Sequence, residues 1–293
     1  MRAIGVFLVV SFGVSWAIGA WLYSEGGLAG AGAFATLYMT GFMFGPAIGA
    51  IVATILFDRN RALTALGFRP GRAGPVVVWT IWGWLVPVVL AALASIVTLV
   101  LTRSEPADAA AALAAVVEAS GQEVPMSPEM LLTLQLAIGV PVGILINTVL
   151  LTISEELGWR GWLQPRLSGL GFWVQSLVIG VIWGVWHAPL VLMGYNYPGL
   201  GWTGVAAMTL FTVLLTPYLA LARERGGGVY AAGAFHGSIN AVAGVGLIFL
   251  PDQNWPWNGL LGLGGFAVLA AGLVPIALYR QARGKIGAAD GDV

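Results

Sequence analysis

The chain has 293 residues, of which 58% are hydrophobic and only 9% are charged, and its 13 basic residues balance 13 acidic ones. Soluble globular proteins are about half apolar and roughly a quarter charged, so this composition excludes an ordinary water-soluble enzyme and a disordered chain. A formal net charge of zero offers no basic surface to nucleic acid, and the lack of cysteine excludes disulfides, thiolate zinc sites and thiol nucleophiles.

Long apolar stretches predict an all-α protein, a polytopic membrane helical bundle of about eight transmembrane helices. A hydrocarbon layer of about 30 Å needs roughly 20 apolar residues for each helical crossing. We expect residues 1–293 to form a single integral membrane domain with the lipid bilayer as its partner. The predicted spans, in chain order, are Ile4–Leu22, Ala35–Phe57, Pro75–Leu101, Met130–Ile153, Phe172–Met193, Thr203–Ala222, Val229–Leu250 and Gly259–Tyr279.

The basic residues predict the orientation of these spans. If the N-terminus is cytoplasmic, every lysine and arginine except Arg103 falls in a cytoplasmic segment. This bias follows the positive-inside rule and places both termini in the cytoplasm. We therefore expect an integral protein of a prokaryotic plasma membrane, with its site opening toward the cytoplasm.

The longest connection, residues 102–129, lies on the outer side in this scheme. Its Ala-rich segment from Ala107 to Ala119 predicts a surface helix. The sequence Ser127-Pro128-Glu129 combines an N-cap residue, a proline at the first helical position and an early acid, and so predicts the start of the fourth span.

The first of three polar clusters follows the fourth span. Glu156 and Arg160 are four residues apart, so they share a helix face and can pair. Glu155 points elsewhere and lacks this partner. A desolvated carboxylate without a cation can act as a base near neutral pH. A charged helix end neutralised by Arg160 is the alternative explanation.

The other two clusters lie inside the fifth and seventh spans. Trp183 and His187 share one helix face, as do His236 and Asn240. A structural histidine or interhelical hydrogen bonding could explain either cluster alone. However, these are the chain's two histidines, and ionisable groups inside a membrane usually face a cavity or pathway.

The depths of the two histidines differ in this scheme. His236 lies about 10 Å above the start of its span and His187 about 22 Å above the start of its own, by helical rise. To share one site, the fifth helix must begin deeper, or Gly169–Gly171 must mark a re-entrant bend.

In this order, the clusters resemble the motifs of the CPBP family of intramembrane proteases (the CAAX-protease and bacteriocin-processing group) and of the related Rce1 glutamate endopeptidases. The resemblance covers residues 130–250, which we expect to form the catalytic helical core. Tryptophan replaces the family's usual phenylalanine in the second motif, which keeps the aromatic bulk. The motifs read Glu155-Glu156-x-x-x-Arg160, Trp183-x-x-x-His187 and His236-x-x-x-Asn240.

The resemblance implies an intramembrane endopeptidase that acts on a membrane-associated peptide or protein without a metal or other cofactor. It assigns activation of water to Glu155 and His187, and stabilisation of the oxyanion to His236 and Asn240. Glu156, Arg160 and Trp183 would be supporting residues.

Three alternatives stay open from the residues alone. Two histidines and a glutamate form a legitimate zinc ligand set, although the chain lacks the His-Glu-x-x-His pattern. The same ionisable residues could serve a proton-coupled transporter. A non-catalytic immunity or scaffold protein could also retain the fold.

Overall fold

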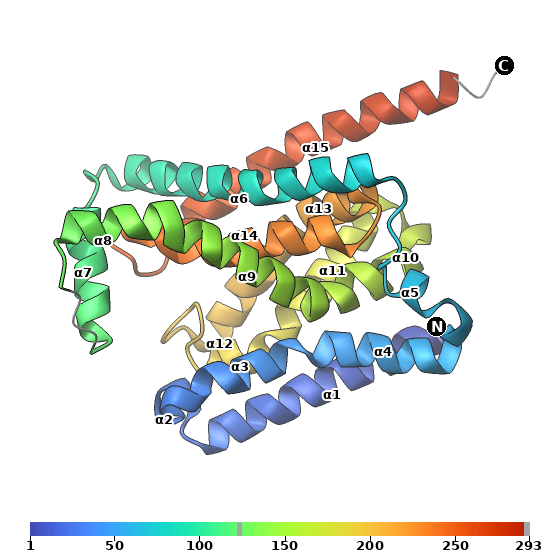
Figure 1. Cartoon of the computed structure of the whole chain (residues 1–293), viewed down its shortest axis with the longest axis horizontal. Helices are drawn as coiled ribbons and strands as arrows, with labels where there is room; N and C mark the ends of the chain where they lie inside the picture. Colours follow the sequence, from blue (N-terminus) through green and yellow to red (C-terminus); the bar gives the residue numbers. More distant parts are fainter. Residues whose placement is uncertain (122–124, 290–293) are drawn as a thin grey trace.

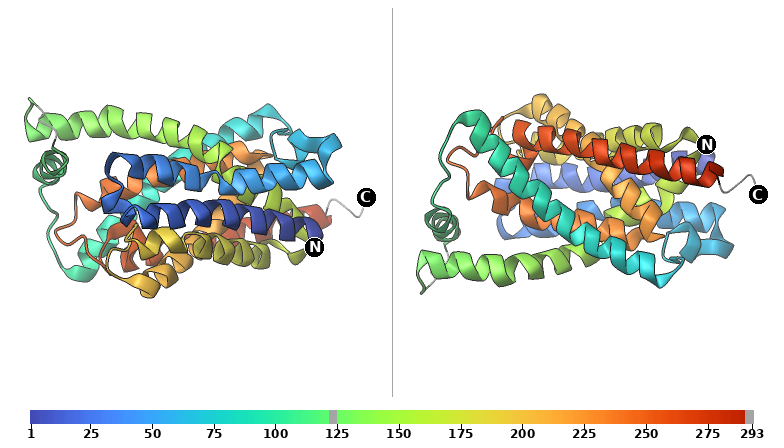
Figure 2. Two further views of the ribbon diagram at one scale, coloured as in Figure 1. Left: turned by 90° about the horizontal axis from the view of Figure 1, so that it is seen from below. Right: turned by 90° about the horizontal axis from the view of Figure 1, so that it is seen from above.

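The computed structural model describes residues 1–121 and 125–289, and within these ranges it contains helices and no strands. The predicted all-α fold is confirmed. Most of the long helices run along one direction of the molecule (Figure 1), and the start of α1 and the end of α15 lie at the same end of the bundle (Figure 2). Which end faces the cytoplasm remains a prediction.

Every predicted span is largely helical, but several are broken into shorter helices. The breaks fall at prolines, glycines and two π-helical turns, Gln135–Gly139 and Leu157–Leu163. The helices are α1 (Arg2–Ser24), α2 (Gly27–Gly30), α3 (Ala35–Met43), α4 (Gly45–Phe57), α5 (Ala62–Ala65), α6 (Ala73–Thr102), α7 (Ala109–Ala119), α8 (Pro128–Leu134), α9 (Val140–Ile153), α10 (Gln164–Arg166), α11 (Phe172–Trp186), α12 (Ala188–Leu192), α13 (Gly201–Gly226), α14 (Val229–Leu247) and α15 (Leu263–Ala289).

Among the described residues, six helical stretches are long and apolar enough to cross a membrane. The fifth and seventh predicted spans are not among these six, each for its own reason. The fifth is divided at His187 into α11 and α12, because Pro189 has no N–H to continue the helix. The seventh is α14, whose many small and polar residues lower its hydropathy. The count of eight crossings therefore remains a prediction.

Two described parts of the connection between α6 and α9 form as their sequences predict. Residues Ala109–Ala119 form α7, and the Asp108 side chain caps its N-terminus. The hydroxyl of Ser127 accepts a hydrogen bond from the Met130 N–H, so α8 begins at Pro128. Figure 2 shows α7 nearly end-on, across the direction of the bundle.

Helix α14 lies at the centre of the bundle, packed against α9 and α6 (Figure 1). Its glycines allow this close approach. A Cβ at Gly233 would collide with the Thr152 side chain, and a Cβ at Gly237 would collide with the backbone of Thr148. This packing places His236 next to α9, the helix that directly precedes Glu155 and Glu156.

We expect Gly237→Ala to destabilise the protein by about 1–3 kcal/mol, the usual cost of overpacking a core. The added methyl group must push α9 away, because it meets backbone atoms rather than a flexible side chain. Thermal unfolding in detergent measures the loss. Gly244→Ala, on the same helix, is the matched control because open space surrounds that position. Equal melting temperatures for the two variants would contradict the packing described.

Candidate active site

The acidic pair, Glu155 and Glu156, is buried and lies between α9 and a π-helix. Residues Leu157–Leu163 form a π-helix in which every residue is buried. Two glycines permit this: a Cβ at Gly158 would meet Pro46 of α4, and one at Gly161 would meet the backbone of Leu66. The N-terminal part of the chain therefore packs against one side of this π-helix, and the Arg160 side chain within it is buried.

Glu156 joins two of the motifs through one carboxylate oxygen. Its Oε1 accepts hydrogen bonds from Nη1 of Arg160 at 2.7 Å and from Nδ1 of His236 at 2.8 Å. Arg160 also donates from Nη2 to the Thr216 hydroxyl at 3.3 Å. Glu156 and Arg160 are 0% exposed, and a buried charge pair of this kind needs such additional hydrogen bonds. The helical spacing predicts the pair with Arg160, whereas the bond to His236 links residues 80 positions apart.

Trp183 lies between the remaining groups. Its indole Nε1–H donates to Oε2 of Glu155 at 2.8 Å. Its ring centroid lies 5.0 Å from that of His236 and 5.7 Å from that of His187. The guanidinium carbon of Arg160 lies 4.5 Å from the centroid of the same ring. The motif resemblance predicts only aromatic bulk at Trp183; its N–H donor, which an indole supplies and phenylalanine lacks, was not predicted.

His187 occupies the junction between α11 and α12 and is buried. Its Nδ1 lies 2.8 Å from the carbonyl oxygen of Trp183, one turn earlier. Because a carbonyl only accepts, Nδ1 carries the proton and Nε2 of the neutral ring is an acceptor. Helix side chains lean toward the helix N-terminus. Both imidazoles contact the Trp183 ring, so the two histidines share one site although the helix starts predict different depths.

A cavity of about 390 Å³ collects the motif residues. Glu155, Trp183, His187, His236 and Asn240 line it, and Asn240 is exposed toward it, while Glu156 and Arg160 lie behind this wall. The other lining residues come from α3, α9, α11, α12, α13, α14, the loop after α12 and the 3-10 turn Gly259–Leu261.

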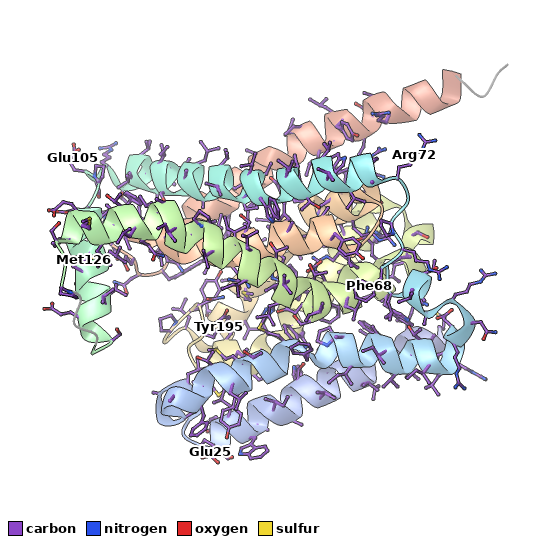
Figure 3. All side chains as sticks on the ribbon, in the orientation of Figure 1. Glu25, Phe68, Arg72, Glu105, Met126 and Tyr195 are labelled. Atoms are coloured by element: carbon purple, nitrogen blue, oxygen red, sulfur yellow. The ribbon has the colours of Figure 1, made fainter. Side chains whose placement is uncertain are left out.

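Five polar lining residues were not predicted from the sequence: Thr36 and Thr40 of α3, Asn147, Tyr195 and Asn196. Asn147 carries the one amide side chain of α9, and a polar amide in an apolar span is a signal that could have predicted it. Tyr195 and Asn196 follow α12 in a loop whose position depends on the break at His187. Figure 3 labels Tyr195 between the ribbons of α3 and α9 in that view.

The polar groups that line this cavity suit proton transfer and stabilisation of an oxyanion. Glu155 offers a carboxylate, His187 an imidazole acceptor, and Asn240 an amide N–H. Among the residues that the structure describes, no group of three or more histidine or carboxylate side chains is placed to hold a metal ion. Chelation, described below, tests the zinc alternative directly.

The fold and cavity define a helical membrane protein with a buried carboxylate–imidazole site. Residues 137–242 match the family model described as Type II CAAX prenyl endopeptidase Rce1-like, and this match confirms the resemblance predicted from the motifs. CAAX prenyl protease 2 of Methanococcus maripaludis is 37% identical over 60 residues, which are 19% of this chain and 21% of that protein. The chain therefore aligns with about a fifth of the length of this relative.

Proposed function

We propose that the chain is an intramembrane endopeptidase that hydrolyses a peptide bond in a membrane-associated peptide or protein. The observation that carries this proposal is the cavity that Glu155, His187, His236 and Asn240 line together, although they come from three separate segments of the chain. The matched family supports the reaction class. Because the matched family is that of CAAX prenyl endopeptidases, prenylated CAAX peptides are the first substrates to test.

In the proposed reaction, Glu155 and His187 position and activate one water molecule. The Trp183 N–H occupies one oxygen of Glu155, which leaves the other oxygen for water. Nε2 of His187 accepts a second hydrogen bond. Glu155 takes a proton as the water oxygen attacks the carbonyl carbon, and it returns that proton to the amide nitrogen as the C–N bond breaks. The products are a carboxyl group and an amine.

His236 and Asn240 bind the carbonyl oxygen as negative charge develops on it. They lie one turn apart on α14 and both line the cavity. Nδ1 of His236 donates to Glu156. A neutral imidazole has only one N–H, so Nε2 can donate to the oxyanion only when the ring is doubly protonated. The hydrogen bond from Nδ1 to Glu156 holds the ring in place. Glu156 and Arg160 thereby support the oxyanion site from behind the wall.

Asn240→Ala tests the proposed function. Loss of one oxyanion donor typically lowers kcat about 10²–10³-fold, and we expect a smaller change in KM because the charge develops only in the transition state. The assay uses purified protein in detergent and fluorogenic CAAX peptides, prenylated and unprenylated, beside a peptide library from membrane proteins. Absence of cleavage by the wild-type protein throughout, or an unchanged kcat in Asn240→Ala, would refute the assignment.

A further inference from the structure

The tryptophan in the second motif makes two kinds of contact that can be separated. Its ring packs against both histidines and carries the Arg160 guanidinium on its face. Its N–H makes a hydrogen bond to Glu155 at 2.8 Å, and Trp183 is 1% exposed, so water does not compete for this donor. A phenylalanine at this position would keep an aromatic ring, although a smaller one, and lose the bond.

We propose that Trp183 is a positioning residue whose indole N–H orients the Glu155 carboxylate and stabilises its charged form. This inference rests on the proposed function, because it concerns the base of that reaction. The bond fixes Oε2 and thereby directs the second oxygen of Glu155 to the cavity. It also offsets part of the cost of burying a charge that has no direct cation partner among the described residues, where Arg160 is bound to Glu156.

The charged and titratable groups around Glu155 show why the Trp183 N–H affects its charge. Glu156 of the same turn opposes the charge on Glu155, whereas Arg160 and His236 favour it without a hydrogen bond to it. His187, between α11 and α12, and Tyr195, in the loop after α12, complete the titratable lining of the cavity. None of these groups is itself replaced when Trp183 becomes phenylalanine, and the change removes the N–H together with part of the ring.

The pH profile of Trp183→Phe tests the inference. Without the donor, Glu155 holds its proton to higher pH, so the acid limb of kcat/KM moves to higher pH. We expect kcat/KM to fall about tenfold on that limb, the effect of losing a hydrogen bond to a charged group, and much less on the plateau. A residue that only fills space would lower activity equally at every pH and leave the limb in place.

Two further proteins complete the test. Trp159→Phe is the matched control: Trp159 is 0% exposed, its Nε1 has no acceptor among the described residues, and it does not line the cavity. Its acid limb is expected to match that of the wild type. If Trp183→Phe fails to fold, 3-benzothienylalanine at position 183 keeps the shape of the indole and removes only the N–H.

The outcomes separate the inference from the proposed function. Cleavage by the wild type that depends on Glu155, with the limb displaced in the Trp183 variants alone, supports the inference. Cleavage that depends on Glu155, with an undisplaced limb in Trp183→Phe or in the benzothienylalanine protein, overturns it and leaves the proposed function standing. Cleavage that does not depend on Glu155 overturns both.

Discussion

Glu155→Gln is expected to abolish peptide cleavage and leave the protein folded. The glutamine carbonyl can still accept the Trp183 N–H, so the local packing and the 2.8 Å contact need not change. The amide cannot take a proton from water at neutral pH. A positioned general base contributes about 10²–10⁴ to the rate, so kcat should fall by at least that factor.

The measurement compares kcat and the melting temperature of each purified variant. Glu129→Gln is the matched control, because this carboxylate lies in the first turn of α8, is exposed and does not line the cavity. It should retain the wild-type kcat. Cleavage by Glu155→Gln within a few fold of the wild-type rate would show that Glu155 is not the base.

Arg160→Met is expected to cause the largest loss of stability among single substitutions at the site. It removes the guanidinium that donates to Glu156 at 2.7 Å, and it leaves a carboxylate that is 0% exposed with His236 as its remaining hydrogen-bond donor. Removing one partner of a buried ion pair typically costs about 3–5 kcal/mol, because the other charge stays buried.

Arg280→Met provides the comparison. Arg280 also pairs with a glutamate, Glu224, at 2.6 Å, but both side chains are partly exposed. Exposed pairs contribute about 0–1 kcal/mol. Unfolding titrations in mixed detergent should therefore separate the two variants by several kcal/mol. Adding Glu156→Gln to Arg160→Met should restore part of the loss. Similar small losses in Arg160→Met and Arg280→Met would contradict the burial described.

The fold class could be predicted because length and apolarity decide whether a helix suits a membrane. The regions of all eight apolar stretches are helical, and the Ala-rich outer helix and the Ser127 cap also appear where their residues predict them. The break at His187 could not be placed, since a proline in an apolar run can either kink a helix or end it. The π-helix at Leu157–Leu163 could not be predicted either, because no local sequence pattern indicates it.

Within the site, sequence spacing predicts neighbours on one helix but not the partners across helices. The pair of Glu156 and Arg160 follows from the four-residue spacing. The bonds from Trp183 to Glu155 and from His236 to Glu156 depend on how α11 and α14 are rotated about their axes. That rotation is set by close contacts such as Gly237 on Thr148, which only the packed structure specifies.

In the proposed mechanism, Glu155 and His187 activate water while His236 and Asn240 stabilise the oxyanion, and no metal ion takes part. Cleavage by wild-type protein that has been dialysed against EDTA, with its zinc content measured, tests it most directly. We predict an unchanged kcat at a zinc content far below one ion per chain. Loss of cleavage on chelation, with recovery when zinc is added back in a one-to-one ratio, would contradict the claim and assign the same residues to a zinc peptidase.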